Sequence, residues 1–438
     1  MSFFNYHISN ATFSWFVNCK WLLMTTLLMS SSQLFAKELN LATAINLMTE
    51  QNPSLKIFDL KERTLDAARY TAALNPEFQI ALEAENFSGS KSFKGLEQSE
   101  LTVSISSVLE LGGKKEARTN HALKQYELLN IQRKIKSLDL ISELTDVFID
   151  TLATQERIKL AIESVRLSQD IYHSIKQKAA LGAIGDAEVS RAYASLKQAK
   201  LTLQAEQSKF DRQRVKLSLY WAEKQPQFNH LVGDLFDFRT TKEIGLLFEN
   251  LEQSNLIKVL STNQTLAESR VKMIQADAKT NVNWSLGLRR IEANNDTALT
   301  AGLSVPLFNT TRNKGALIEA ETAVDAFNSK QRIELLNLYG QVNDIYSLRT
   351  TAIERFKVLE KEIIPALSHA LKQTQDAYLD GRYGYLEYSA ARADLIQAKK
   401  SLIDTAQDIL KHGIQLERII TAPIYNEPQH TQGEGGES

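Results

Sequence analysis

Two pairs of short segments in this chain alternate strictly between apolar and polar side chains. The segments are 78–85 and 101–106 in the first pair, and 284–288 and 299–305 in the second. Alternation with a period of two is typical of β-strands whose two faces meet different surroundings. Polar loops at 88–98 and 292–296 separate the members of each pair. The pattern therefore predicts two hairpins, at about 78–108 and about 283–306.

The predicted strands are long enough to cross a membrane. A tilted strand needs about nine residues to span a bilayer, and one apolar face would contact lipid. Four strands are too few to close a barrel, which needs about eight, and an open sheet edge is not tolerated in lipid. We therefore expect the chain to oligomerise, with eight strands in a dimer or twelve in a trimer.

Long helices fill most of the remaining sequence. No glycine or proline occurs between Lys114 and Leu181, and apolar residues recur there every three or four positions. This spacing predicts a rod of about 100 Å with one packed face. Shorter helices are expected at about 54–73 and about 253–281. An ordinary soluble coiled coil is an alternative that the helical pattern alone leaves open.

The chain contains an internal duplication. The segment 182–200 matches the segment 381–399 at ten of nineteen positions, at a constant offset of 199 residues. Each half has the same order: a helix, two strands, a very long helix, a glycine-marked turn and a returning helix. We expect a first repeat at 37–221, an inter-repeat equatorial segment at 222–252 and a second repeat at 253–420.

Both ends of the chain differ from the repeats. Residues 1–36 combine Lys20, a short apolar core and the small residue Ala36, which together predict a signal peptide and export. The single cysteine, Cys19, precedes that apolar core and so does not match a lipid-acylation site. Residues 421–438 are rich in Gln, Gly, Glu and Ser, a composition that favours disorder.

Composition and motifs exclude several classes of function. The 51 basic and 52 acidic residues give a net charge of −1, which disfavours nucleic-acid binding. The seven histidines are scattered and have no cysteine partners, so we predict no catalytic residue, no metal ligand and no cofactor. The run Gly112–Lys115 lacks the spacing of a phosphate-binding loop. We interpret Gly112 and Gly113, like Pro306 in the second half, as strand–helix junctions.

The two glycine turns mark the places where the long helices reverse. Gly182 with Gly185, and Gly381 with Gly384, supply the backbone freedom that a tight helical turn requires. Glu188 and Glu387 then fall in the first turn of the returning helices, where the helix dipole favours a carboxylate. Four aromatic residues flank the predicted strands and suit a membrane interface: Phe78, Phe87, Trp284 and Phe308.

Several motifs, in their order and duplication, resemble the TolC-like outer-membrane efflux proteins, and most closely the heavy-metal branch. The resemblance rests on four segments spread over about 40–420: 41–53, 109–118, 305–315 and 378–387. It implies a mainly α fold with a small β part, in which a trimer closes a twelve-strand barrel above a long helical tunnel. It also implies an outer-membrane location in a Gram-negative bacterium, with the helices in the periplasm.

The resemblance also implies partners and roles. The expected partners are a periplasmic adaptor and an inner-membrane resistance–nodulation–division pump, with the adaptor docking at Gly182, Gly185, Gly381, Arg382, Tyr383 and Gly384. Glu387, and by duplication Glu188, would ring the tunnel exit as a carboxylate gate. The expected function is passive export of heavy-metal cations, without enzymatic activity. A duct for drugs or for type I protein secretion, and a soluble helical scaffold, are the alternatives.

Overall fold

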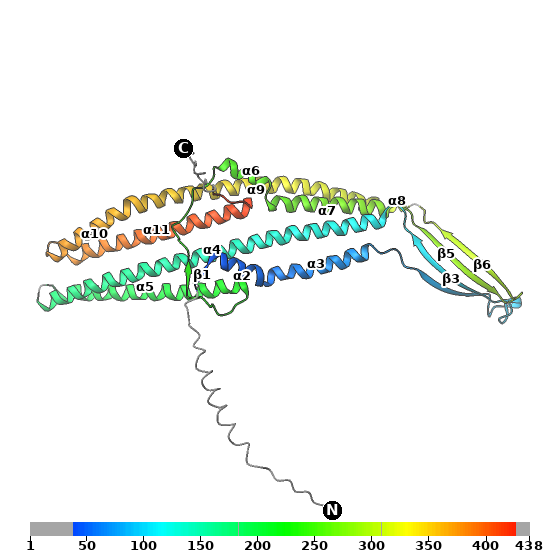
Figure 1. The fold of residues 1–438 in the computed structure, drawn as a ribbon, viewed down its shortest axis with the longest axis horizontal. Coiled ribbons are helices and arrows are strands. Elements are labelled where there is room, and N and C mark those ends of the chain that lie inside the picture. The colour runs from blue at the N-terminus through cyan, green and yellow to red at the C-terminus, as the bar shows by residue number, and fades with distance from the viewer. Residues whose placement is uncertain (1–37, 183, 308, 426–438) are drawn as a thin grey trace, which may run out of the picture.

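The protein is a long helical rod with a four-stranded sheet at one end (Figure 1). The computed structural model describes residues 38–182, 184–307 and 309–425, and the predicted signal peptide at 1–36 lies outside them. Helices account for most of the described chain, which confirms the mainly α fold with a small β part.

The sheet consists of the two expected hairpins, joined side by side. The strands are β2 (Gln79–Glu85), β3 (Glu100–Leu109), β5 (Val282–Ile291) and β6 (Asp296–Ser304). All neighbours are antiparallel in the order β2-β3-β5-β6, so β2 and β6 form the two edges. The pairing of Ile80 with Ile105, and of Leu286 with both Ile105 and Ala301, sets the register.

This register gives the sheet two unlike faces, because side chains that are paired across strands share a face. One face is almost continuously apolar, whereas the other carries serine, threonine, glycine and charged residues. The apolar face is open: Ile80, Leu299 and Leu303 are 80%, 78% and 79% exposed. An apolar surface of this extent requires a non-aqueous neighbour.

The first long hairpin of helices follows directly from β3. Helix α4 (Lys114–Ala180) has 67 residues and returns as α5 (Asp186–Ser218). Its buried residues cluster between Leu140 and Thr154, at the middle of the rod, where the largest hydrophobic core lies. The absence of Gly and Pro from 114 to 181 therefore does correspond to one uninterrupted helix.

The corresponding helix of the second half is interrupted. After the short α8 (Asn309–Arg312), helix α9 (Lys314–Val358) passes into a π-helical turn, η3 (Leu359–Ile363), and continues as α10 (Ile364–Leu379). Pro365 cannot donate a backbone hydrogen bond, and its ring crowds the carbonyl four residues earlier. The wider π turn relieves that crowding, so the helix bends without breaking. Helix α11 (Tyr385–Ile420) then returns to the middle.

The helices form a curved layer. Helices α2 (Leu41–Gln51) and α3 (Pro53–Ala72) lie with α5 on one side of α4, while α7 (Asn255–Asp277) and α11 lie on its other side. Helices α9 and α10 form the far edge, next to α7 and α11 (Figure 1). None of the described helices combines the length and the apolar character that crossing a membrane requires.

Three features at the middle of the rod are absent from the sequence predictions. Strands β1 (Glu38–Asn40) and β4 (His230–Val232) form a small parallel sheet, and α6 (Ile244–Glu252) packs against α9 and α11. Arg349 is fully buried on α9, where its guanidinium donates to Thr241 and to the carbonyls of Arg239 and Ile409.

The start of the predicted disordered tail is ordered. The structure describes 421–425 of the 421–438 segment, where Ile424 is fully buried and Tyr425 forms a β-bridge with Thr241. Disorder is therefore the wrong prediction for these five residues, because Ile424 completes a hydrophobic core with α6 and α11. The remaining residues, 426–438, lie outside the described chain.

Candidate functional site

The two helical turns lie together at the end of the rod opposite the sheet (Figure 1). The two glycines of each pair have different backbone conformations. Gly182 and Gly381 have φ angles of +73° and +77°, the left-handed geometry that terminates α4 and α10. Gly185 and Gly384 have φ near −85° and −81°, and act as the extended N-cap residues of α5 and α11. Only the first glycine of each pair is therefore required for its left-handed backbone.

The two candidate gate carboxylates occupy equivalent positions in unequal surroundings. Glu188 and Glu387 are both in the first turn of their helix, as the duplication predicts. A side chain at Gly384 would come within 3.0 Å of the Glu387 carboxylate, so the glycine leaves room for it. Glu387 is exposed, whereas Glu188 is half-buried and lies close enough to Tyr378 to affect its ionisation.

The predicted docking residues of the second turn are exposed. Arg382 forms an ion pair with Asp380 at 2.9 Å, and both side chains are open to solvent. The backbone N–H groups of Arg382 and Tyr383 donate to the carbonyl of Ala377, which closes the turn. Tyr383 is 53% exposed. The turn is thus internally fixed while its side chains remain exposed to solvent.

Two residues that the sequence analysis did not single out join the turns to each other. The Lys178 ammonium, at the end of α4, donates to the carbonyls of Tyr378 and Leu379 at 3.2 and 3.1 Å. It also lies 4.8 Å from the centre of the Tyr378 ring. The last carbonyls of a helix attract a cation, so Lys178 neutralises the end of α10 from the neighbouring hairpin.

Tyr378 is buried beneath this contact. Burial, reinforced by the nearby Glu188 carboxylate, raises the pKa of the Tyr378 hydroxyl to about 12. The hydroxyl is therefore protonated over the whole physiological range, and it has no hydrogen-bond partner among the described residues. Tyr378 packs with Ile175, Tyr385 and Tyr388 in an apolar cluster shared by both hairpins.

A ladder of polar contacts joins α4 to α11 along the rest of their shared length. Its contacts, counted toward the turns, are Asp139–Arg418, Asp150–Lys411, Arg157–Asp404, Glu163–Lys399 and Ser168–Arg392, at 2.6–2.8 Å. In three of the four ion pairs the carboxylate belongs to α4 and the cation to α11. Partly exposed pairs contribute little stability each, so the ladder fixes the alignment of the two helices more than it holds them together.

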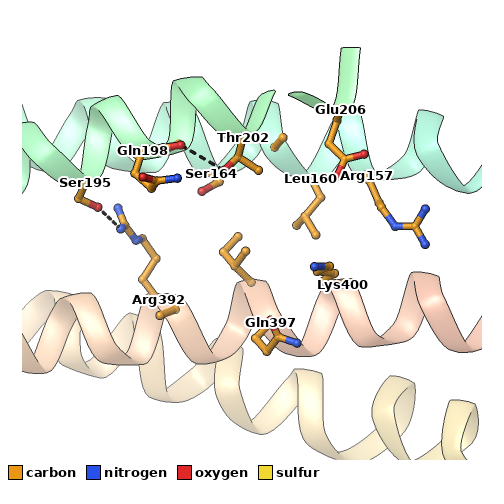
Figure 2. A pocket seen from close by; sticks show the side chains of 14 residues that line it. Arg157, Leu160, Ser164, Ser195, Gln198, Thr202, Glu206, Arg392, Gln397 and Lys400 are labelled. Atoms are coloured by element: carbon orange, nitrogen blue, oxygen red, sulfur yellow. Dashed lines mark hydrogen bonds between the residues drawn. The ribbon is translucent and has the colours of Figure 1, made fainter. Parts of the chain in front are cut away.

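A cavity of about 380 Å³ with a mixed apolar and polar lining lies within this ladder, between α4, α5 and α11. Figure 2 shows Arg392 reaching from α11 to Ser195 of α5 across the cavity. Arg392 is 9% exposed, and its hydrogen-bond partners within the described chain are the hydroxyls of Ser168 and Ser195. One buried cation thus links three helices that belong to both hairpins.

The predicted strand–helix junctions lie where the sheet meets the rod. Gly112 and Gly113 have φ angles of +80° and +73° between β3 and α4, and a side chain at Gly112 would overlap Lys279. Pro306 lies between β6 and α8. The first glycine therefore permits both the turn and a close approach.

The flanking aromatic residues lie at both ends of the sheet. Phe78 and Trp284 contact edge to face, 6.2 Å apart, at the end next to the helices. Phe87 is exposed in the loop at the opposite end. Phe308 lies outside the described residues.

Charges on the polar face of the sheet gather near its outer end. Arg289 of β5 bonds the carboxylates of Glu85 and Glu100 at 3.0 and 2.7 Å, so it ties β5 to β2 and β3. Across the described chain, no three His, Cys, Asp or Glu side chains gather closely enough to hold a metal ion.

Comparison with known proteins agrees with this geometry. The profile of the family described as "Outer membrane efflux protein" matches residues 44–223 and 246–422. The cobalt-zinc-cadmium resistance protein CzcC of Cupriavidus metallidurans is 25% identical over 394 residues, covering 88% of this chain and 90% of that protein. The nickel-cobalt-cadmium resistance protein NccC of Alcaligenes xylosoxydans xylosoxydans is 24% identical over 61% of each chain. The crystal structure of CusC superimposes with a TM-score of 0.74 at 16% identity, covering 88% of this chain and 93% of that one.

Replacing Lys178 by Met is expected to loosen the contact between the two turns. The variant loses two hydrogen bonds and a cation–π contact, which together contribute about 1 kcal/mol at a half-exposed site. Amide hydrogen exchange at 378–384 should therefore become roughly fivefold faster. Lys176→Met, two residues earlier on an exposed face, is the matched control. Equal exchange in both variants would contradict the role given to Lys178.

Proposed function

The chain belongs to the outer membrane efflux protein family, and from this premise we propose that it forms the outer-membrane duct of a tripartite efflux pump. The family is defined by transport, and we propose no enzymatic role for the chain. The proposal rests on a structural observation. Within the described chain, the sheet and the helical layer each have two unpaired edges, and the edges on one side of the molecule are complementary to those on the other.

The two edges of the sheet continue into the two edges of the helical layer. Strand β2 follows α3, and strand β6 precedes α9, so each side of the molecule has one free strand and one free helix. Apolar side chains are exposed on both helical edges, including Leu60 on α3 and Leu336 on α9, at 61% and 67%. An edge of β2 and α3 on one copy suits an edge of β6 and α9 on the next.

Repeating this contact in a ring closes the sheet. Because unlike edges meet, the contact is heterologous. Each copy can therefore bind a further copy until the ring closes on the first one. We propose a trimer, in which four strands per chain give twelve. The apolar face of the sheet then contacts lipid, and the polar face with Glu100 and Arg289 lines the interior.

The duplication supports a domain division along the same lines. We propose repeats at 37–221 and 253–420, each with one β-hairpin and one helical hairpin, separated by the equatorial segment 222–252. In a trimer each repeat would supply one of six similar sectors. The two turns of each chain would then surround the far end of the helical passage.

We propose that this end is the gate and the docking surface for the adaptor. In the trimer, the exposed Glu387 carboxylate would be repeated three times around the exit, with the half-buried Glu188 farther from solvent. Carboxylates concentrated in a narrow passage attract cations and repel anions. The exposed Arg382 and Tyr383 would contact a periplasmic adaptor that links the duct to a resistance–nodulation–division pump.

For the exported substrate we propose heavy-metal cations. The support comes from CzcC and NccC, whose names record resistance to cobalt, zinc, cadmium and nickel. The pump selects most of what enters the duct, so a duct for drugs or for secreted proteins remains the second candidate. A soluble scaffold is disfavoured by the wide apolar face of the sheet.

Disulfide crosslinking tests the ring. Strands β2 and β6 of one chain are separated by three strand spacings, about 14 Å, which a disulfide cannot span. Ile80→Cys combined with a cysteine scan of Leu299, Ala301 and Leu303 should therefore crosslink only between chains, giving products up to trimers. Ile80→Cys with Ile105→Cys joins directly paired residues and is the intrachain control. Products longer than trimers, or none, would refute the closed ring.

Deletion of the gene tests the substrate. The deletion strain should become several-fold more sensitive to cobalt, zinc or cadmium, and the intact gene should restore resistance. Sensitivity to hydrophobic drugs should stay unchanged in the same strain. The reverse result would favour the second candidate over the metal duct.

Replacing Glu387 by Ala tests the gate. Loss of three carboxylates at the exit should raise the concentration of divalent cation that half-blocks reconstituted channels by about threefold or more. Glu360→Ala removes the same charge from an exposed position at the beginning of the bend and should leave block unchanged. If both variants are blocked like the original channel, Glu387 does not form the gate.

A further inference from the structure

We propose that the loop joining β2 to β3, together with Arg290 of β5, binds the phosphate groups of the outer leaflet's anionic lipid. The inference rests on the proposed outer-membrane location. It concerns residues 86–99, at the end of the sheet farthest from the helices (Figure 1). No part of the gate or the docking surface lies in this region.

The loop combines exposed apolar and cationic side chains. Phe87, Phe93 and Leu96 are 53%, 44% and 70% exposed, although the rest of this loop consists of polar residues and glycine. Lys91 and Lys94 lie between them and are exposed, and neither forms an ion pair within the described chain. Aromatic rings at the acyl boundary and lysines at the headgroups are the arrangement that a lipid interface favours.

The loop has a defined shape. The N–H of Ser88 donates to the carbonyl of Gly95, and that of Gly89 donates to the carbonyl of Phe93. A short 3-10 turn over Lys91–Phe93 brings Lys91 into the left-handed region, with φ of +56°. A non-glycine residue adopts this conformation at a cost in conformational free energy. The surrounding loop therefore holds this lysine in a defined position.

The adjoining strand carries a third cation on the lipid-facing side. Arg290 is paired with Leu101 and shares the apolar face with Leu288, but it lies one step closer to the outer end. Its guanidinium turns toward the hairpin end, where it donates to the carbonyl of Asn295 and forms an ion pair with Glu292 at 3.5 Å. An arginine near the outer end of a lipid-facing strand is favourable, because the headgroup phosphates lie at that level of the bilayer.

The two hairpin loops differ, which argues against a general property of exposed turns. The second loop, 292–295, is short, carries Glu292 and contains no cation or aromatic residue. The first has fourteen residues with two lysines and one glutamate. The other cation of this region, Arg289, is already paired with Glu85 and Glu100 on the opposite face. Within the described chain, Lys91 and Lys94 are therefore the cations of this region without an ion pair, and Arg290 stays half-exposed beside its pair with Glu292.

Native mass spectrometry of the detergent-solubilised trimer tests this proposal with purified lipid A as the probe. The original protein should bind bisphosphorylated lipid A at least about fivefold better than lipid A stripped of phosphate. The double variant Lys91→Gln/Lys94→Gln should weaken binding of the phosphorylated form roughly tenfold, and Arg290→Gln should weaken it further. The double variant Lys361→Gln/Lys372→Gln removes two exposed charges at the helical end and is the matched control.

Equal binding of both lipids, or equal binding by the two double variants, would overturn the proposal. The loop variant is expected to fold, because its lysines have no partner within the described chain. A chain that forms no detergent-stable trimer would instead contradict the proposed duct. The two failures are therefore distinguishable in one experiment.

Discussion

The structure depends on the backbone hydrogen bonds that one chain cannot complete. A four-stranded sheet has two edges of unpaired N–H and C=O groups, and leaving them in hydrocarbon costs several kcal/mol per group. No side chain within the sheet can remove this cost. The edges must pair with other copies. Because helices α3 and α9 are connected to the edge strands, this pairing also places the helices of neighbouring copies side by side. Oligomerisation thus follows from strand number rather than from any particular contact.

The helical part meets a different constraint. Helices α4 and α11 share the large apolar core at the middle of the rod, and ion pairs and hydrogen bonds also join them along their length. Separating apolar surfaces exposes them to water, but separated ion pairs are rehydrated at little net cost. The shared apolar cores therefore hold the two hairpins together, and the ion pairs mainly fix their alignment. Lys178 and the shared apolar cluster around Tyr378 join the two hairpins near the turns.

The sequence predicts features that depend on period and composition. Alternation over 78–85 and the absence of Gly and Pro over 114–181 are local signals, and the strands and α4 follow them closely. Contacts between distant segments have no such signal. Arg349 resembles any helical arginine until the Arg239–Thr241 segment and Tyr425 are folded around it. The π turn before Pro365 was within reach of sequence reasoning, since a proline in a helical pattern predicts a bend.

The duplication also explains why the sequence did not predict some residues of the candidate site. Positions that match between the repeats, such as Glu188 and Glu387, are found by the alignment itself. Some contacts that join one hairpin to the other use positions where the repeats differ: Lys178 corresponds to Ala377, Tyr378 to Ala179, and Arg392 to Tyr193, whereas the paired Glu163 and Lys399 match Glu362 and Lys200. Divergence at these positions therefore adds contacts that only one of the two hairpins can make, and the residues that diverged are the ones that a search for repeats sets aside.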